Sequence, residues 1–188
     1  MNIQKTVVSV ACTAALLALI AIPGGAQQGP PPLGDGLPAP SDDDVTSADA
    51  IIAALYDVIS GAAGEERDWD RWRSLFANGS QLIPTGRRPN SPRAGARFMT
   101  IEDYIVGSGP RLEESGFFES EIGRHTVSFG NVTHAFSAYE SRRTAEGEVF
   151  MRGINSIQLF DDGERWWIMN VMWDSERPDN PIPEQYLN

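Results

Sequence analysis

The sequence predicts an α+β domain in which N-terminal helices pack on a strongly curved antiparallel sheet. Between residues 46 and 115 apolar residues recur every three or four positions, which is typical of helices. From Phe117 onward the period changes to two, and turn residues at 130–131, 145–147 and 161–163 separate four long segments. Hairpin turns make neighbouring strands antiparallel, and strands this long must twist and curl.

The first forty-five residues predict an export signal followed by a tether. Lys5, an apolar run over residues 7–22 and small residues before Gln27 form the three-part layout of a secretory signal over residues 1–26. A secreted or periplasmic protein is therefore expected. The run is shorter than the roughly 20 residues of a membrane helix, and an uncleaved anchor is the alternative. Residues 27–45 are rich in Pro, Gly and Asp, which predicts a flexible tether.

Composition excludes several kinds of chemistry. A net charge of −11 opposes binding to nucleic acid and to anionic lipids, so neither nucleic acid nor, after signal cleavage, a membrane is expected as a partner. The only cysteine, Cys12, lies in the apolar run, so the folded part has no thiol nucleophile. With two histidines in the chain, we expect no metal site, and no sequence motif indicates a cofactor.

Three helices are expected before the sheet. The first begins at Thr46 or Ser47, which can cap it, and ends near Gly61. The second covers residues 65–76, where four large apolar side chains share one face. The third covers residues 101–115, because Thr100 and Asp103 form a capping-box pattern, and its glycines and proline predict an irregular helix. An arginine-rich loop, residues 85–97, precedes it.

The strands follow from the alternation and from the turns between them. A short strand is predicted at residues 81–84, and the long strands at 117–129, 132–144, 148–160 and 165–174. The last is apolar on both faces, so periodicity does not say which face meets the helices. Residues 177–188 are expected to form a C-terminal tail.

The order of three segments resembles a known family. These segments are the helix that ends at residues 68–76 just before a short strand, the helix that precedes the meander, and the closing hairpin of residues 153–168. Together they resemble the SnoaL-like branch of the nuclear-transport-factor-2-like superfamily over a domain of residues 46–176. The resemblance implies a cone with an internal pocket between sheet and helices, and a homodimer. The superfamily includes ketosteroid isomerase, polyketide cyclases, dehydratases and members that only bind or assemble, so it does not determine a chemistry.

Three residues are candidates for proton transfer in such a pocket. His125 lies in the first long strand, where alternation puts it on the same face as Glu121, a carboxylate that could orient it. Tyr139 offers a phenol, and Asp174 ends the last strand, where an apolar cavity would raise its pKa. The alternatives are a solvent-facing histidine, a packing tyrosine and a surface ion pair between Asp174 and Arg177.

Further side chains are candidates for ligand binding. Asn155 and Asn170 are amides inside apolar strands, where a buried amide needs a hydrogen-bond partner in the protein or in a ligand. Arg152 could clamp a carboxylate, or pair with Glu140 or Glu148 on the outer face. The remaining candidates are polar or large side chains expected near the pocket: Tyr56, Trp72, Tyr104, Glu121 and Met172.

Three functions remain open at this point. The first is acid–base catalysis, of isomerase, cyclase or dehydratase type, on a small and largely apolar molecule. The second is ligand binding without catalysis in the same pocket. The third is an assembly domain that dimerises through the outer face of the sheet, and this is compatible with either of the others.

Overall fold

A computed structural model describes residues 32–87 and 93–187. The described residues form one compact unit that begins at Pro32. The predicted signal of residues 1–26 lies outside the described residues. Within the described ranges no helix is both long and apolar enough to cross a membrane.

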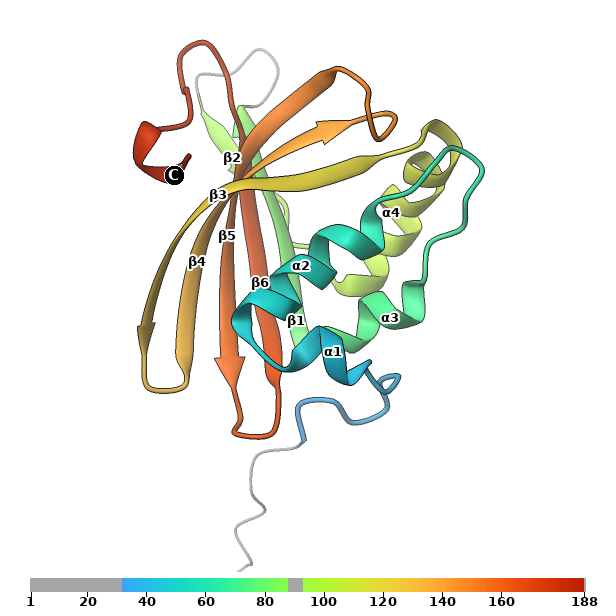
Figure 1. Ribbon diagram of the computed structural model, residues 1–188, viewed down its shortest axis with the longest axis vertical. Coiled ribbons are helices and arrows are strands. Elements are labelled where there is room, and N and C mark those ends of the chain that lie inside the picture. The colour runs from blue at the N-terminus through green and yellow to red at the C-terminus, as the bar shows by residue number, and fades with distance from the viewer. Residues whose placement is uncertain (1–31, 88–92, 188) are drawn as a thin grey trace, which may run out of the picture. The chain divides into compact units, whose positions relative to one another are not determined.

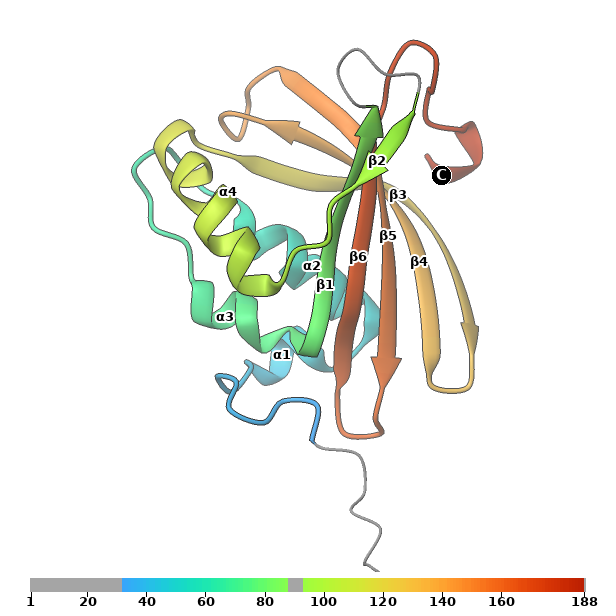
Figure 2. The same ribbon diagram turned by 180° about the vertical axis from the view of Figure 1, so that it is seen from behind.

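The described unit has helices on one side of a six-stranded sheet, as predicted (Figure 1). The helices are α1 (Asp42–Val45), α2 (Ala48–Ile59), α3 (Trp69–Ser74), α4 (Ile101–Ser115) and the 3-10 helix η1 (Glu184–Tyr186). The strands are β1 (Phe76–Arg87), β2 (Ala94–Ala96), β3 (Phe118–Phe129), β4 (Val132–Arg142), β5 (Val149–Asp161) and β6 (Trp166–Ser175). Their order across the sheet is β2-β1-β6-β5-β4-β3, with β2 and β1 at one edge (Figure 2).

Local sequence explains where the helices begin. The Ser47 hydroxyl accepts a hydrogen bond from the Ala50 N–H at 3.0 Å and starts α2. The predicted capping box is present at α4, where Thr100 and Asp103 each bond the other's backbone N–H. The irregularity predicted from its glycines and proline does not interrupt α4, which runs through Pro110 as one helix of 15 residues.

The sheet is antiparallel except at one pair of strands. β3 to β6 form a meander joined by hairpins, whereas β1 runs parallel to β6. β1 is reached from α3 rather than through a hairpin, so its direction is set by the helical layer. It is also longer than the predicted strand at 81–84 at both ends, because Phe76 already pairs with Ile168 of β6 and residues 85–87 pair with β2.

Two segments that the sequence places outside the domain pack against it. Residues 32–45 belong to the compact unit, although the pattern predicted a tether. Arg71 holds Asp44 of α1 through two hydrogen bonds of 2.7 and 2.8 Å, which fixes this segment to α3. In the C-terminal tail, the ring of Tyr186 lies 5.4 Å from that of Phe136, on the convex side of the sheet.

The apolar faces of the helices meet the concave face of the sheet in one core. Trp72 of α3 is 2% exposed, and its ring stacks on Tyr104 of α4 at 5.2 Å between ring centroids. Phe76, at the start of β1, packs on the same indole at 4.8 Å. This aromatic cluster fills one end of the space between the layers.

Candidate functional site

A cavity of about 620 Å³ opens between α2, α4 and the concave face of the sheet. Its walls are mostly apolar and include Leu55, Ile59, Leu82, Leu112, Val171 and Trp173. Among the polar side chains that line it are Tyr104, Glu119, Tyr139 and Asn155. A largely apolar hollow with a few converging polar groups is the usual form of a small-molecule site.

Glu119 of β3 is the ionisable group inside this cavity whose pKa lies nearest neutrality. Burial raises the pKa of Glu119 to about 7, although hydrogen bonding with Ser141 and Asn155 lowers it. The Ser141 hydroxyl donates to Oε2 of Glu119 at 2.9 Å. Glu119 is surrounded by protein and still partly exposed, because it faces the open cavity. A carboxyl poised near pH 7 can both accept and release a proton.

Tyr139 of β4 presents a hydroxyl with no hydrogen-bond partner among the described residues. The residue is 1% exposed. Burial, then the Glu119 charge, raises the pKa of Tyr139 to about 12, although the nearby Ser175 side chain lowers it. Gly153 lies opposite on β5, where a Cβ would come within 2.5 Å of this hydroxyl. The absence of a side chain at Gly153 therefore makes room for the phenol. An unpaired buried hydroxyl costs about 1–3 kcal/mol, which a ligand oxygen could recover.

Tyr104 of α4 faces the same space from the helical side. Burial raises the pKa of Tyr104, and the charges of Glu119 and Tyr139 raise it further. The three ionisable side chains therefore lie close enough to influence one another across the cavity. Both phenols remain protonated near neutral pH and can act only as donors or neutral acceptors there.

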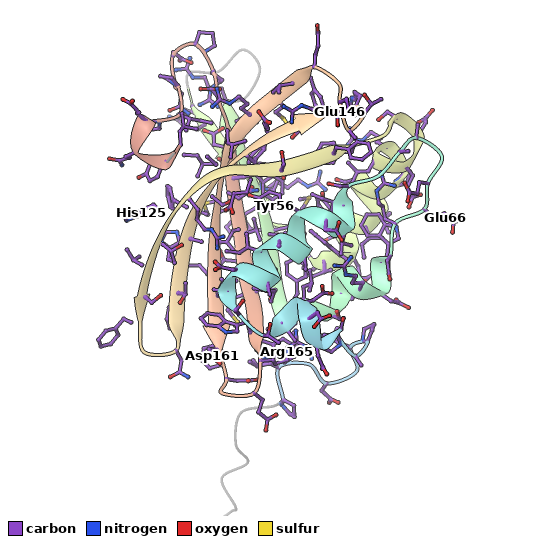
Figure 3. All side chains as sticks on the ribbon, viewed as in Figure 1. Tyr56, Glu66, His125, Glu146, Asp161 and Arg165 are labelled. Carbon is purple, nitrogen blue, oxygen red and sulfur yellow. The ribbon has the colours of Figure 1, made fainter. Side chains whose placement is uncertain are left out.

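A chain of hydrogen bonds leads from the cavity to a second carboxylate. The Asn155 amide donates to the Tyr56 hydroxyl at 3.1 Å, and Tyr56 lies 2.6 Å from the Ser137 hydroxyl. Ser137 donates to Glu121, so Tyr56 must be the donor to Ser137, and every bond points toward Glu121. Glu121 is itself paired with Arg124 at 3.0 Å. Figure 3 shows Tyr56 between α2 and the sheet, where it anchors this chain.

A second hollow of about 460 Å³ lies along α2 and β3 and shares Glu119 with the first. Tyr56 and Glu121 line it together with Asp49, Asp57 and Arg124. Glu119 therefore borders both hollows, one mostly apolar and the other rich in charged groups. This position gives the carboxyl a route for exchanging its proton with solvent.

The structure distributes the predicted site residues over several places. Tyr104, Tyr139 and Asn155 line the large cavity. Tyr56 and Glu121 belong to the hydrogen-bonded chain beside it. Trp72 lies in the aromatic core and lines none of the three hollows described here. Glu119, the side chain with the pKa nearest neutrality, was not among the predicted site residues, although alternation placed it on the face of Glu121.

His125 does not reach the cavity. A β-bulge between Glu121 and Gly123 shifts the register of β3 against β4, so Glu121 pairs with Tyr139 and His125 with Phe136. These partners lie on opposite faces, and the prediction that His125 and Glu121 share a face is therefore wrong. The His125 side chain is exposed on the convex side (Figure 3), near the ring of Tyr186.

A second bulge lies in β6, where Met169 is an extra residue opposite Gln158 and Leu159 of β5, and it changes the alternation of β6. It places Val171 and Trp173 on the concave face, and the candidates Asn170, Met172 and Asp174 on the convex one. Arg177 donates to Asp174 at 2.6 Å, and this hydrogen bond lowers the pKa of Asp174. The expectation of a raised pKa at Asp174 is therefore wrong, since the carboxyl is paired at the surface.

The other convex-face candidate, Arg152, pairs with Glu176 at 3.4 Å. Met172 and Asp174 border a hollow of about 250 Å³ between the convex face and residues 180–183. Across residues 32–87 and 93–187, no cluster of three or more His, Cys, Asp or Glu could hold a metal ion.

Comparison with known proteins identifies the fold. No family model matches the sequence, and no curated protein does. A Nostoc punctiforme protein of unknown function with a cystatin-like fold superposes with a TM-score of 0.51 at 10% identity, covering 71% of this chain and 90% of that one. The β subunit of a candidate aromatic-ring-hydroxylating dioxygenase from Novosphingobium aromaticivorans superposes with a TM-score of 0.51 at 14% identity. This match covers 70% of this chain and 90% of that one.

A nuclear transport factor 2-like superfamily protein from Salmonella enterica gives a TM-score of 0.48 at 15% identity, covering 72% of this chain and 92% of that one. At such identities the similarity concerns the fold alone. The SnoaL-like branch, a narrower assignment, stays a prediction. The helices followed by a curved, unclosed sheet give this chain a cone-like fold, which it shares with the Nostoc punctiforme protein of cystatin-like fold.

Proposed function

We propose that the large cavity binds a small, largely apolar molecule and that Glu119 moves a proton on it. The observation that carries the proposal is a carboxyl with a pKa of about 7 in a mostly apolar cavity that also holds the unpartnered Tyr139 hydroxyl. Acid–base enzymes require such a group, with a pKa close to the working pH. Ligand binding without catalysis is the alternative, and it uses the same cavity.

The chemistry that suits this pair is proton removal next to a carbonyl group. The Glu119 carboxylate takes the proton from the carbon, and the electron pair moves onto the carbonyl oxygen of the ligand. The Tyr139 hydroxyl donates a hydrogen bond to that oxygen as it becomes negative. Return of the proton from Glu119 to the same or another carbon completes an exchange or an isomerisation.

We also propose that the protein is exported, because residues 1–26 have the layout of a cleavable secretory signal. A secreted or periplasmic location suits an acidic domain without cysteine. It would be tested by measuring the mass of the mature protein recovered from outside the cytoplasm of an expressing bacterium. Intact residues 1–26 in that product would contradict cleavage.

Self-association is a second candidate role, and a specific surface favours it. Phe129 is 92% exposed at the tip of the β3–β4 hairpin, and Val127 and Val132 beside it are each 53% exposed. Exposed apolar clusters of this kind mark interaction surfaces. Phe129→Asp should lower the apparent mass in sedimentation experiments if a homodimer forms there, and an unchanged mass would exclude this surface.

The catalytic proposal predicts exchange of the α-protons of an apolar ketone. We expect the protein to accelerate deuterium uptake by 2-tetralone, followed by NMR in heavy water. Because Glu119 must be deprotonated to act as the base, the rate should rise with pH through about 7 and then level off. Tyr139→Phe should slow the exchange by roughly 10²–10³-fold, since it removes the donor to the developing oxyanion.

Tyr186→Phe is the matched control, because Tyr186 packs on the convex face. It should leave the exchange rate unchanged. If Tyr139→Phe were as fast as the wild-type protein, or the rate were flat with pH, acid–base catalysis would be abandoned in favour of binding alone.

A further inference from the structure

Two arginine side chains line the mouth of the large cavity without a carboxylate partner. Arg111 projects from α4 and Arg143 follows the end of β4, and both are exposed. Neither forms an ion pair with any residue in the described part of the chain, and Arg111 makes only a 3.4 Å bond to the carbonyl of Gly107. On a protein of net charge −11, unpaired guanidinium groups at a pocket are unexpected.

Several other arginines, in contrast to these two, are paired with carboxylates. Arg71 pairs with two carboxylates, Asp44 and Asp57, at 2.7 and 2.6 Å. Arg73 and Arg124 likewise each have two carboxylate partners. These three arginines are each paired with carboxylates, whereas the two arginines at the mouth of the cavity are paired with none.

Arg143 is also held in position. Its Nη1 donates to the Ser115 hydroxyl at 2.9 Å and to the Gly116 carbonyl at 3.3 Å. Its guanidinium lies 4.2 Å from the centroid of the Phe150 ring, which lines the same mouth. None of these contacts uses its Nε or Nη2, so the outer fork of the guanidinium remains for a bidentate acceptor.

We infer that the ligand of the large cavity is an amphipathic organic anion, with its apolar body inside and its acidic group at Arg111 and Arg143. The inference rests on the proposed cavity and names the class of molecule that it takes. Glu119 lines the inner part, and its negative charge disfavours the reverse orientation. Glu114 also lies at the mouth and forms an ion pair with neither arginine. It lowers the summed charge of these three side chains from +2 to +1.

A pair of fluorescent probes that differ in one group tests the inference. We would compare 8-anilinonaphthalene-1-sulfonate with N-phenyl-1-naphthylamine, which has the same aromatic body without the sulfonate. In the full protein, the double change Arg111→Gln and Arg143→Gln should weaken the sulfonate by roughly 5- to 25-fold, as expected for two exposed charge contacts. The neutral probe should bind the wild-type and double variant equally, and only the sulfonate should weaken with added salt.

Two further variants make every outcome informative. Arg152→Gln removes the same charge from the convex face and should change neither affinity. Met151→Trp fills the cavity from its wall and should block both probes. If Met151→Trp blocks both probes but the arginine variant binds the sulfonate normally, the anion inference fails and the cavity proposal stands. If Met151→Trp has no effect, or neither probe binds, both fail.

Discussion

Replacing Glu119 by glutamine is expected to abolish most proton transfer while making the protein more stable near neutral and alkaline pH. General acid–base groups contribute about 10²–10⁴-fold to rate, so exchange of 2-tetralone protons should fall by that factor in Glu119→Gln. The amide has nearly the shape of the carboxyl and can still accept the hydrogen bond from Ser141. The loss would therefore report on the proton and not on the shape of the cavity.

The gain in stability follows from the direction of the pKa shift. The pKa of Glu119 is about 7 in the folded protein and 4.5 in an unperturbed glutamate, so the folded state binds the proton more tightly. The carboxyl thus favours folding below the unfolded pKa, and this contribution is lost as pH rises from about 4.5 to about 7. At about 1.4 kcal/mol per unit, the ionised group lowers the free energy of unfolding by about 3 kcal/mol above pH 7.

Urea denaturation of both proteins at about pH 4 and about pH 8 measures this difference. Glu119→Gln should match the wild-type protein in acid and exceed it by about 2–3 kcal/mol in base. Glu140→Gln is the control, because Glu140 lies on the convex face of β4 and pairs with Arg142. It should leave the pH dependence unchanged. Equal stability of Glu119→Gln and wild type at both pH values would mean that Glu119 titrates normally.

The fold was predictable because its signals are local. Gly130, Gly147 and Gly163 each lie in a turn of the meander, and each of its four strands, β3 to β6, begins within one residue of its predicted start. Side-chain alternation then follows from strand geometry alone. The parallel pairing of β1 with β6 has no such local signal, since no turn joins the two strands.

The site was harder to predict because single-residue irregularities invert a strand's faces. A bulge adds one residue, after which every side chain lies on the other face. The bulge after Glu121 turns His125 outward, and the bulge after Ile168 does the same to Asn170 and Asp174. The cavity candidates Tyr139 and Asn155 do line the cavity. Both lie where β4 and β5 pair without a bulge, so the alternation of their side chains is undisturbed.

Residues 32–45 are a second case in which the local amino-acid composition does not predict the structure. A segment rich in Pro, Gly and Asp buries little apolar surface, which predicts a tether. Asp44 nevertheless meets Arg71, 27 positions away in sequence, and the Asn78 N–H bonds the Leu33 carbonyl at 2.7 Å. Contacts of this kind, between positions far apart in the sequence, cannot be inferred from local composition.

The second large effect, on the free energy of unfolding, is expected from replacing Arg67, a buried arginine with a structural role. Arg67 is 6% exposed, and its guanidinium donates to backbone carbonyls on three sides. The acceptors are the carbonyl oxygens of Ile59 at 3.1 Å, Gly61 at 2.8 Å, Glu65 at 2.6 Å and Leu112 at 3.3 Å. These bonds join the end of α2, the loop after it and α4.

Arg67→Met keeps a side chain of similar length and removes the guanidinium donors from those carbonyls, of which the Gly61 carbonyl keeps its bond from the Phe117 N–H. Each buried unsatisfied group costs about 1–3 kcal/mol, so the free energy of unfolding should fall by about 3–5 kcal/mol. Urea denaturation measures this loss of unfolding free energy, with Arg73→Met as the control. Arg73 makes only ion pairs with the exposed Asp70 and Glu102, and its loss should cost about 1 kcal/mol or less. Similar losses in the two variants would contradict the structural role of Arg67.

The same substitution links stability to the cavity. Ile59 and Leu112, whose carbonyls Arg67 holds, also line the cavity from its two helical walls. Arg67 therefore fixes the separation of α2 and α4 without touching a ligand. In Arg67→Met, the backbone N–H groups that bond across this junction, those of Gly61, Gly64 and Phe117 among them, should exchange with heavy water faster than those of the β4–β5 ladder. Exchange that rises equally everywhere would instead indicate global destabilisation, with no specific effect on the cavity walls.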